Sequence, residues 1–148
     1  MAIWVLAALA LALGALLPVQ VGANAELAGW LGAAVRASLV NFGLGFFLLT
    51  GFALVFVRGL PSAGGIAGAP WWAWTGGVVG ASYVLGSTLL GPRLGAVTFF
   101  AVLLAGQTVA SLIVDHYGWL GFAEREITAG RLTGVALLAA GVVLVRAF

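Results

Sequence analysis

Residues 37–57, ASLVNFGLGFFLLTGFALVFV, form a continuous run without a charged side chain. A helix needs about 20 apolar residues to cross the hydrocarbon core of a bilayer. An open sheet would leave backbone groups without hydrogen bonds in lipid. The run also lacks the alternating pattern that is typical of a barrel strand. The stretch therefore predicts a membrane-spanning helix.

The whole chain has the same apolar character. Of its 148 residues, 64% are hydrophobic and 7% are charged, whereas a soluble domain has about 25% charged residues. This composition excludes a soluble enzyme, a nucleic-acid-binding protein and a disordered linker. Cysteine is absent, which excludes disulfides and thiolate chemistry. With a single histidine and four scattered carboxylates, we expect neither a metal site nor a cofactor.

The charged residues separate the apolar stretches and so indicate where helices end. Residues 61–70 contain two prolines and three glycines and are expected to form a loop. The cluster Trp71, Trp72 and Trp74 follows this loop, and such a cluster is typical of residues at the level of the lipid headgroups. We predict an all-α domain over residues 1–148 with five transmembrane helices, at about 2–24, 37–57, 71–90, 95–114 and 128–147.

The N-terminal run allows a second interpretation. Ala23, Asn24 and Ala25 resemble the cleavage site of a signal peptide. However, no basic residue precedes the run, and it is long enough to span a bilayer. We therefore keep it as the first helix.

The positions of the arginines bear on how the chain is oriented in the membrane. With five spans, one side of the membrane carries Arg58, Arg125 and Arg131, and the other carries Arg36, Arg93 and Arg146. An excess of basic residues normally marks the cytoplasmic side, and here there is none. Either one arginine dominates and the balance is accidental, or copies of the chain insert in both orientations.

Polar side chains recur inside the predicted spans. Gln20 and Asn24 are four residues apart, as are Tyr83 and Ser87, so each pair lies on one helix face. We expect Pro18 to kink the first helix next to its amides. The candidate lining of a substrate cavity is Gln20, Asn24, Asn41, Trp74, Tyr83, Ser87 and Gln107. The alternative is that these groups form hydrogen bonds between helices and have no ligand.

Small residues and carboxylates give weaker indications. Gly130 and Gly134 form a GxxxG pattern that would let helices approach closely. Glu26 and Asp115 are candidates for proton coupling, and the alternative is that both mark the membrane interface. No arrangement of nucleophile and base suggests catalysis, so we do not expect an enzyme.

Several segments resemble one family. They are PWWAWTGG at 70–77, GPRLGA at 91–96, AGQ at 105–107 and ASLIVDHYG at 110–118. Gln20, Gly22, Asn24, Asn41, Phe42, Gly45, Gly130, Arg131, Leu132, Gly141 and Val142 fit the same pattern. The chain is identified as resembling the YdcZ-like family of half-size members of the drug/metabolite transporter (EamA-like) superfamily.

The resemblance implies an assembly and a function. Full-length relatives carry two inverted five-helix halves, so a half-size chain is expected to form a ten-helix antiparallel homodimer or to pair with a homologous subunit. The implied function is a secondary transporter of the bacterial inner membrane that moves a small metabolite or drug-like solute by alternating access. Small multidrug exporters of the superfamily carry a glutamate in the middle of helix 1, where this chain has Gln20 and Asn24. The alternative function is a structural or accessory membrane subunit.

Overall fold

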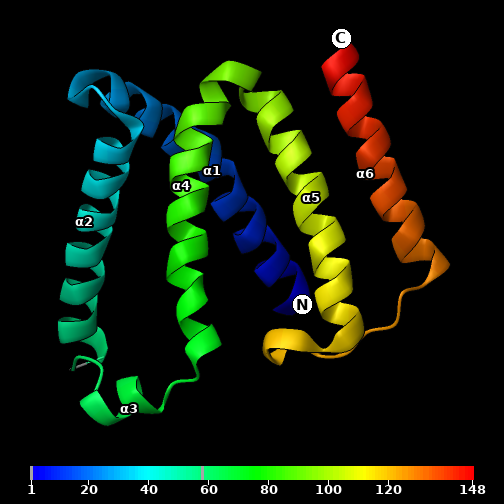
Figure 1. The fold of residues 1–148 in the computed structure, drawn as a ribbon. Helices are drawn as coiled ribbons and strands as arrows, with labels where there is room; N and C mark the ends of the chain where they lie inside the picture. The colour runs from blue at the N-terminus through cyan, green and yellow to red at the C-terminus, as the bar shows by residue number, and fades with distance from the viewer. Residues whose placement is uncertain (1, 58) are drawn as a thin grey trace. The chain divides into compact units, whose positions relative to one another are not determined.

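Helices make up most of the chain in the computed structural model, which describes residues 2–57 and 59–148 (Figure 1). The chain divides into two compact units, Met1–Arg93 and Leu94–Phe148. The first unit contains α1 (Ala2–Leu31), α2 (Ala34–Phe52), α3 (Ala63–Gly68) and α4 (Thr75–Leu94). The second contains α5 (Ala96–Tyr117) and α6 (Ala129–Ala147).

Among the described residues, four helical stretches are long and apolar enough to cross a membrane. They are Ile3–Leu31, Ala34–Val57, Ala96–Tyr117 and Ala129–Ala147, which confirms four of the predicted spans. The third predicted span corresponds to α4, which is 20 residues long but is not one of these four. Five glycines, a proline and an arginine lower its hydropathy. The fifth span therefore stays a prediction.

The C-terminal end of the first span differs from the sequence-based boundary. α1 continues past residue 24 through Glu26 and ends at Leu31, because one glutamate in an apolar helix does not break its backbone hydrogen bonds. Gly32, with φ +75°, then lets the chain turn. The guanidinium of Arg36 donates to the carbonyl oxygen of Leu31 at 2.8 Å. Pro18 lies inside α1, which continues on both sides of it.

The segment expected to be a plain loop contains a short helix. The hydroxyl of Ser62 accepts a hydrogen bond from the backbone N–H of Gly65 at 3.1 Å and so caps α3. A 3₁₀ turn, Trp71–Trp74, follows Pro70. As a result α4 begins at Thr75, four residues later than the predicted span.

Small side chains allow the helices of the first unit to pack closely. α1 and α2 contact each other next to their connection and run in opposite directions from it (Figure 1). α4 contacts α1 where Gly91 faces Val21, since a Cβ added to Gly91 would lie 2.5 Å from Val21 Cγ1. It approaches α2 where Gly80 faces the ring of Phe42. The buried residues of this unit include Val21, Asn24, Ala37, Ser38, Val84, Ser87 and Thr88.

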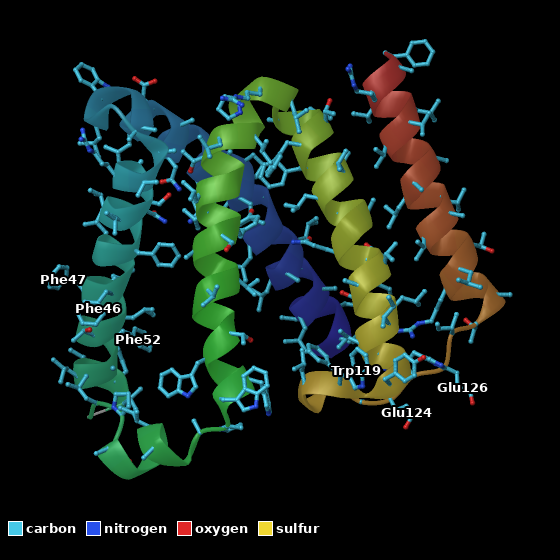
Figure 2. The ribbon with its side chains drawn as sticks, viewed as in Figure 1. Phe46, Phe47, Phe52, Trp119, Glu124 and Glu126 are labelled. Atoms are coloured by element: carbon cyan, nitrogen blue, oxygen red, sulfur yellow. The ribbon has the colours of Figure 1, made fainter. Side chains whose placement is uncertain are left out.

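Large apolar side chains lie mainly on the outside. Phe47 projects from α2 (Figure 2) and is 72% exposed. Contiguous apolar surface on this scale would make a soluble monomer aggregate, whereas in a bilayer it contacts lipid.

The second unit is a pair of antiparallel helices. α5 and α6 pack along their length and are joined by residues 118–128. Gly118, with φ +59°, ends α5 in a left-handed conformation. The hydroxyl of Thr128 accepts from the backbone N–H of Arg131 and begins α6.

We predict that Gly91→Ala destabilises the protein by about 1–3 kcal/mol, because the new methyl group overpacks the contact with Val21. Thermal unfolding in detergent measures the loss. Gly86→Ala on the same helix is the control, since its Cβ meets nothing within 4 Å. The double variant Val21→Ala/Gly91→Ala should recover most of the stability. Equal melting temperatures for Gly91→Ala and Gly86→Ala would contradict the close contact.

Candidate functional site

An open pocket of about 630 Å³ lies in the first unit. Its polar groups are the amides of Gln20 on α1 and Asn41 on α2. The apolar wall comes mainly from α2, with Val84 of α4. The complete lining is Gln20, Asn41, Phe42, Leu44, Gly45, Phe46, Leu48, Leu49 and Val84. Two of the predicted site residues, from separate helices, are therefore brought to one cavity.

Asn24 and Ser87 lie at helix contacts and do not line this pocket. They are 4% and 3% exposed. Ser87 donates its hydroxyl hydrogen to the carbonyl oxygen of Val84 at 3.0 Å, within its own helix. The Nδ2 atom of Asn24 is buried without a hydrogen-bond partner in the described structure, and so is the hydroxyl of Tyr83. A buried amide N–H without a partner costs free energy, so these two groups are available to a ligand or to a rearranged neighbour.

The remaining predicted site residues lie elsewhere. Trp74 is 55% exposed in the 3₁₀ turn before α4 and does not line the pocket. Gln107 is exposed on α5, in the second unit. An exposed amide on an apolar span is unfavourable in lipid unless something covers it.

The sequence analysis missed the aromatic part of the pocket. Phe42 and Phe46 both line it. They follow Asn41 at positions one and five residues later, and Phe42 and Phe46 share one face because they are four residues apart. A search for polar residues alone overlooks such a wall, although the spacing from Asn41 was available as a signal.

The two candidate coupling carboxylates lie in different settings. Glu26 is exposed and accepts a hydrogen bond from the indole Nε1–H of Trp30 at 3.1 Å. Asp115 forms an ion pair with Arg131, and its backbone carbonyl accepts from the N–H of Arg125 at 2.7 Å. Neither carboxylate lines the pocket of the first unit.

Asp115 and Arg131 instead line a smaller pocket of about 280 Å³ between α5 and α6. Thr108 and Ser111 contribute hydroxyl groups to it. Arg131 also donates to the backbone carbonyls of Arg125 and Glu126. The ion pair thus joins the end of α5 to the start of α6, and the other hydrogen bonds of Arg131 hold the loop 118–128.

Within the described residues, no group of three His, Asp or Glu side chains could hold a metal ion. The chemistry of the pocket in the first unit is therefore that of neutral hydrogen-bonding groups in an apolar wall.

The family described as "Putative inner membrane exporter, YdcZ" matches residues 5–144. The chain belongs to this family. The YdcZ match runs from α1 into α6, so it covers helices of both units. This match confirms the resemblance seen in the sequence. Together with the apolar helices, it supports a multi-pass membrane protein. No curated protein and no solved structure matches the chain.

We predict that Asp115→Ala and Arg131→Ala each lower thermal stability, because each removes the ion pair between the end of α5 and the start of α6. Both side chains are partly exposed, so the coupling energy in a double-mutant cycle should be about 1 kcal/mol. Thermal unfolding of the two single variants and the double variant measures it. Glu124→Ala, in the same loop, is the control. Strictly additive losses for the two variants would contradict the coupling.

Proposed function

We propose that the chain is a secondary transporter subunit that moves a small metabolite or drug-like solute across the bacterial inner membrane. The observation that carries the proposal is the meeting of Gln20 and Asn41, from α1 and α2, in one open pocket of an exporter-family protein. Ligand pockets are mostly apolar with a few placed polar groups, and this pocket has that composition. Its function would be transport and not catalysis.

The residues that line the pocket also indicate which kind of solute would fit it. Each amide has a carbonyl oxygen that accepts and an NH₂ group that donates. Phe42 and Phe46 offer ring faces and edges for stacking. The lining contains no charged side chain. Neutral, amphipathic solutes with hydrogen-bonding groups fit this chemistry best.

The buried polar groups next to the pocket support alternating access. Asn24 lies one turn beyond Gln20 on the same face of α1, and its Nδ2 lacks a partner. Tyr83 lies next to the pocket residue Val84. A shift of α4 against α1 would bring these groups to the solute, and the small contact at Gly91 and Val21 is where the two helices would slide. Transporters of inverted repeats work by such rocking.

The proposed transporter is a dimer of two such chains. α4 has 20 residues, which at 1.5 Å per residue is about 30 Å, the thickness of the hydrocarbon core. With α4 as a span, each chain has five, and the arginines divide evenly between the two sides, although Arg58 lies outside the described residues. Gln107, exposed on α5, would gain cover from an inverted second copy or from a paired homologous subunit. Trp74 would lie at the headgroup level, where its exposed ring could stack on an arriving solute.

Asp115 is the better candidate for proton coupling. It is partly buried and paired with Arg131, so its carboxylate lies at the contact between α5 and α6. Glu26 is exposed and bonded to Trp30, which suits a residue at the end of a span.

We predict that Gln20→Leu and Asn41→Leu each reduce transport about fivefold or more, since an unpaired solute group in an apolar pocket costs about 1–3 kcal/mol. A resistance screen on overexpression identifies the solute, and flux of that labelled solute into proteoliposomes measures the effect. Ser82→Ala, on the exposed face of α4, is the control.

Unchanged flux in both leucine variants would disprove the pocket assignment. If the wild-type protein moves no solute and co-purifies with a larger complex, the accessory-subunit alternative would replace transport.

We predict that a C-terminal reporter active only in the cytoplasm and one active only in the periplasm both give signal. Glu124→Lys/Glu126→Lys should bias the chain to one orientation, and Ala96→Lys/Phe148→Lys to the other. Each biased variant alone should lose transport, and co-expression of the two should restore it. Signal from one reporter only, with full activity, would contradict the antiparallel homodimer.

A further inference from the structure

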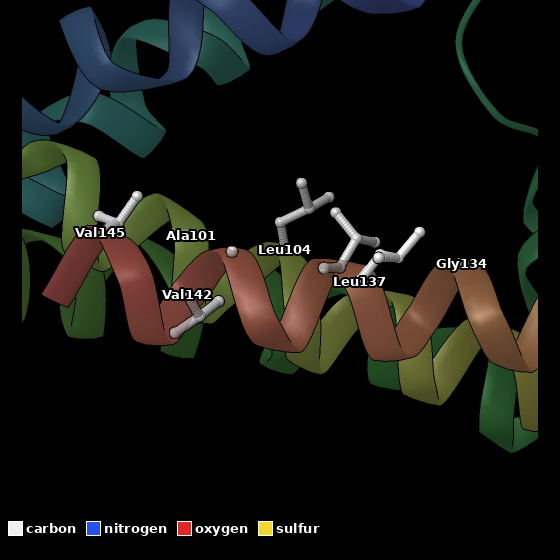
Figure 3. A pocket seen from close by; sticks show the side chains of 8 residues that line it. Ala101, Leu104, Gly134, Leu137, Val142 and Val145 are labelled. Atoms are coloured by element: carbon white, nitrogen blue, oxygen red, sulfur yellow. The ribbon is translucent and has the colours of Figure 1, made fainter. Parts of the chain in front are cut away.

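The small pocket between α5 and α6 continues into a second pocket of about 400 Å³. Gly134 and Leu138 line both of them. The second pocket is almost entirely apolar, and Figure 3 shows Leu104 of α5 with Leu137, Val142 and Val145 along it. Together the two pockets form one groove, which we call the α5–α6 groove.

The polarity of the groove changes in order along each helix. On α5 its lining runs from Asp115 through the hydroxyls of Ser111 and Thr108 to Leu104 and Ala101. These positions are three or four residues apart and so follow one helix face. Charge is thus at one end, hydroxyl groups are in the middle and hydrocarbon is at the other end.

On α6 the lining likewise changes from charged to apolar. Its lining begins at Arg131 and passes Gly134, Leu138 and Gly141 to Val145. The fourteen-residue separation corresponds to about 21 Å of helix. The groove is therefore elongated, with its charged end at the start of α6 and its apolar end near the C-terminus of the helix.

The charged end presents both signs. Arg131 and Asp115 are paired, yet their side chains remain 31% and 24% exposed. Hydrogen bonds hold the Nη1 of Arg131 to two loop carbonyls and its Nη2 to Asp115 Oδ2. Asp115 Oδ1 can accept a hydrogen bond from a cationic group of a ligand. The remaining guanidinium N–H groups of Arg131 can donate to an anionic group. A headgroup with a phosphate and an ammonium complements this pair.

The apolar end is open because two of its lining residues are glycines. A Cβ added to Gly134 or Gly141 would meet nothing within 4 Å, so these positions leave space along α6. In a bilayer an acyl chain can fill such space. A membrane span from a second copy would also lay apolar surface over Asp115 and Arg131, which would leave both without water or a polar partner.

We propose that the α5–α6 groove binds a phospholipid with a zwitterionic headgroup, with the phosphate at Arg131, the ammonium at Asp115 and one acyl chain over Gly134 and Gly141. Ser111, with its exposed hydroxyl group, lies where the glycerol esters would be. The site is separate from the pocket lined by Gln20 and Asn41, and its test measures lipid binding and not transport, although Asp115 is also the coupling candidate.

Native mass spectrometry of the full-length protein, titrated with phosphatidylethanolamine or with phosphatidylglycerol, tests the site. The wild-type protein should retain phosphatidylethanolamine at least fivefold better than the anionic lipid. Gly134→Leu and Gly141→Leu should lose that lipid, because leucine fills the groove. Gly106→Leu on α5 is the matched control, since Gly106 has open space beside it and does not line the groove.

The headgroup assignment has its own readout. Asp115→Asn should reverse the preference toward phosphatidylglycerol, because Arg131 then faces an anionic headgroup alone. If Gly134→Leu does not fold, Gly141→Leu and Asp115→Asn carry the test. Equal binding of both lipids by the wild-type protein would overturn the proposal. So would lipid retention in Gly141→Leu, or a change from dimer to monomer in that variant without any loss of lipid.

Discussion

Every polar group of this chain that enters the bilayer must find a hydrogen-bond partner in the protein, because lipid offers none. The backbone meets this condition by forming helices. Several hydroxyl side chains meet it locally, since Ser38, Thr88 and Thr108 each donate to a carbonyl of their own helix. An amide side chain carries two donors and an acceptor, and one carbonyl cannot satisfy it. The amides, together with the unpaired hydroxyl of Tyr83, are therefore the groups that a ligand could satisfy.

This distinction explains the character of the site. Ser87 and Asn24 are both buried, but only Asn24 keeps an atom without a partner. Gln20 and Asn41 reach an open pocket whose wall is otherwise apolar. Such a lining would suit a neutral, amphipathic solute, and this is the basis of the transport function proposed for a chain of this family.

Glycine has opposite uses in the two units. In the first, Gly91 lets α4 approach Val21 more closely than any side chain would allow. In the second, Gly134 and Gly141 face open space and widen a groove. The same residue type therefore contributes to a helix contact in one place and to a cavity in the other. The spacing pattern of the glycines does not distinguish the two, because it is set by the helix period and not by what lies opposite.

The sequence by itself determined the membrane class, the helical fold and four of the spans, because the length and hydropathy of a charge-free run depend on no other part of the chain. It also placed Gln20 and Asn24 on one face of α1. It did not show that α1 continues to Leu31 or that Ser62 caps a short helix, since both depend on local hydrogen bonds at helix ends. Only the tertiary structure decided that Gln20 shares a pocket with Asn41, while Asn24 is buried against a neighbouring helix. A helical period specifies which residues share a face, and only packing specifies what that face meets.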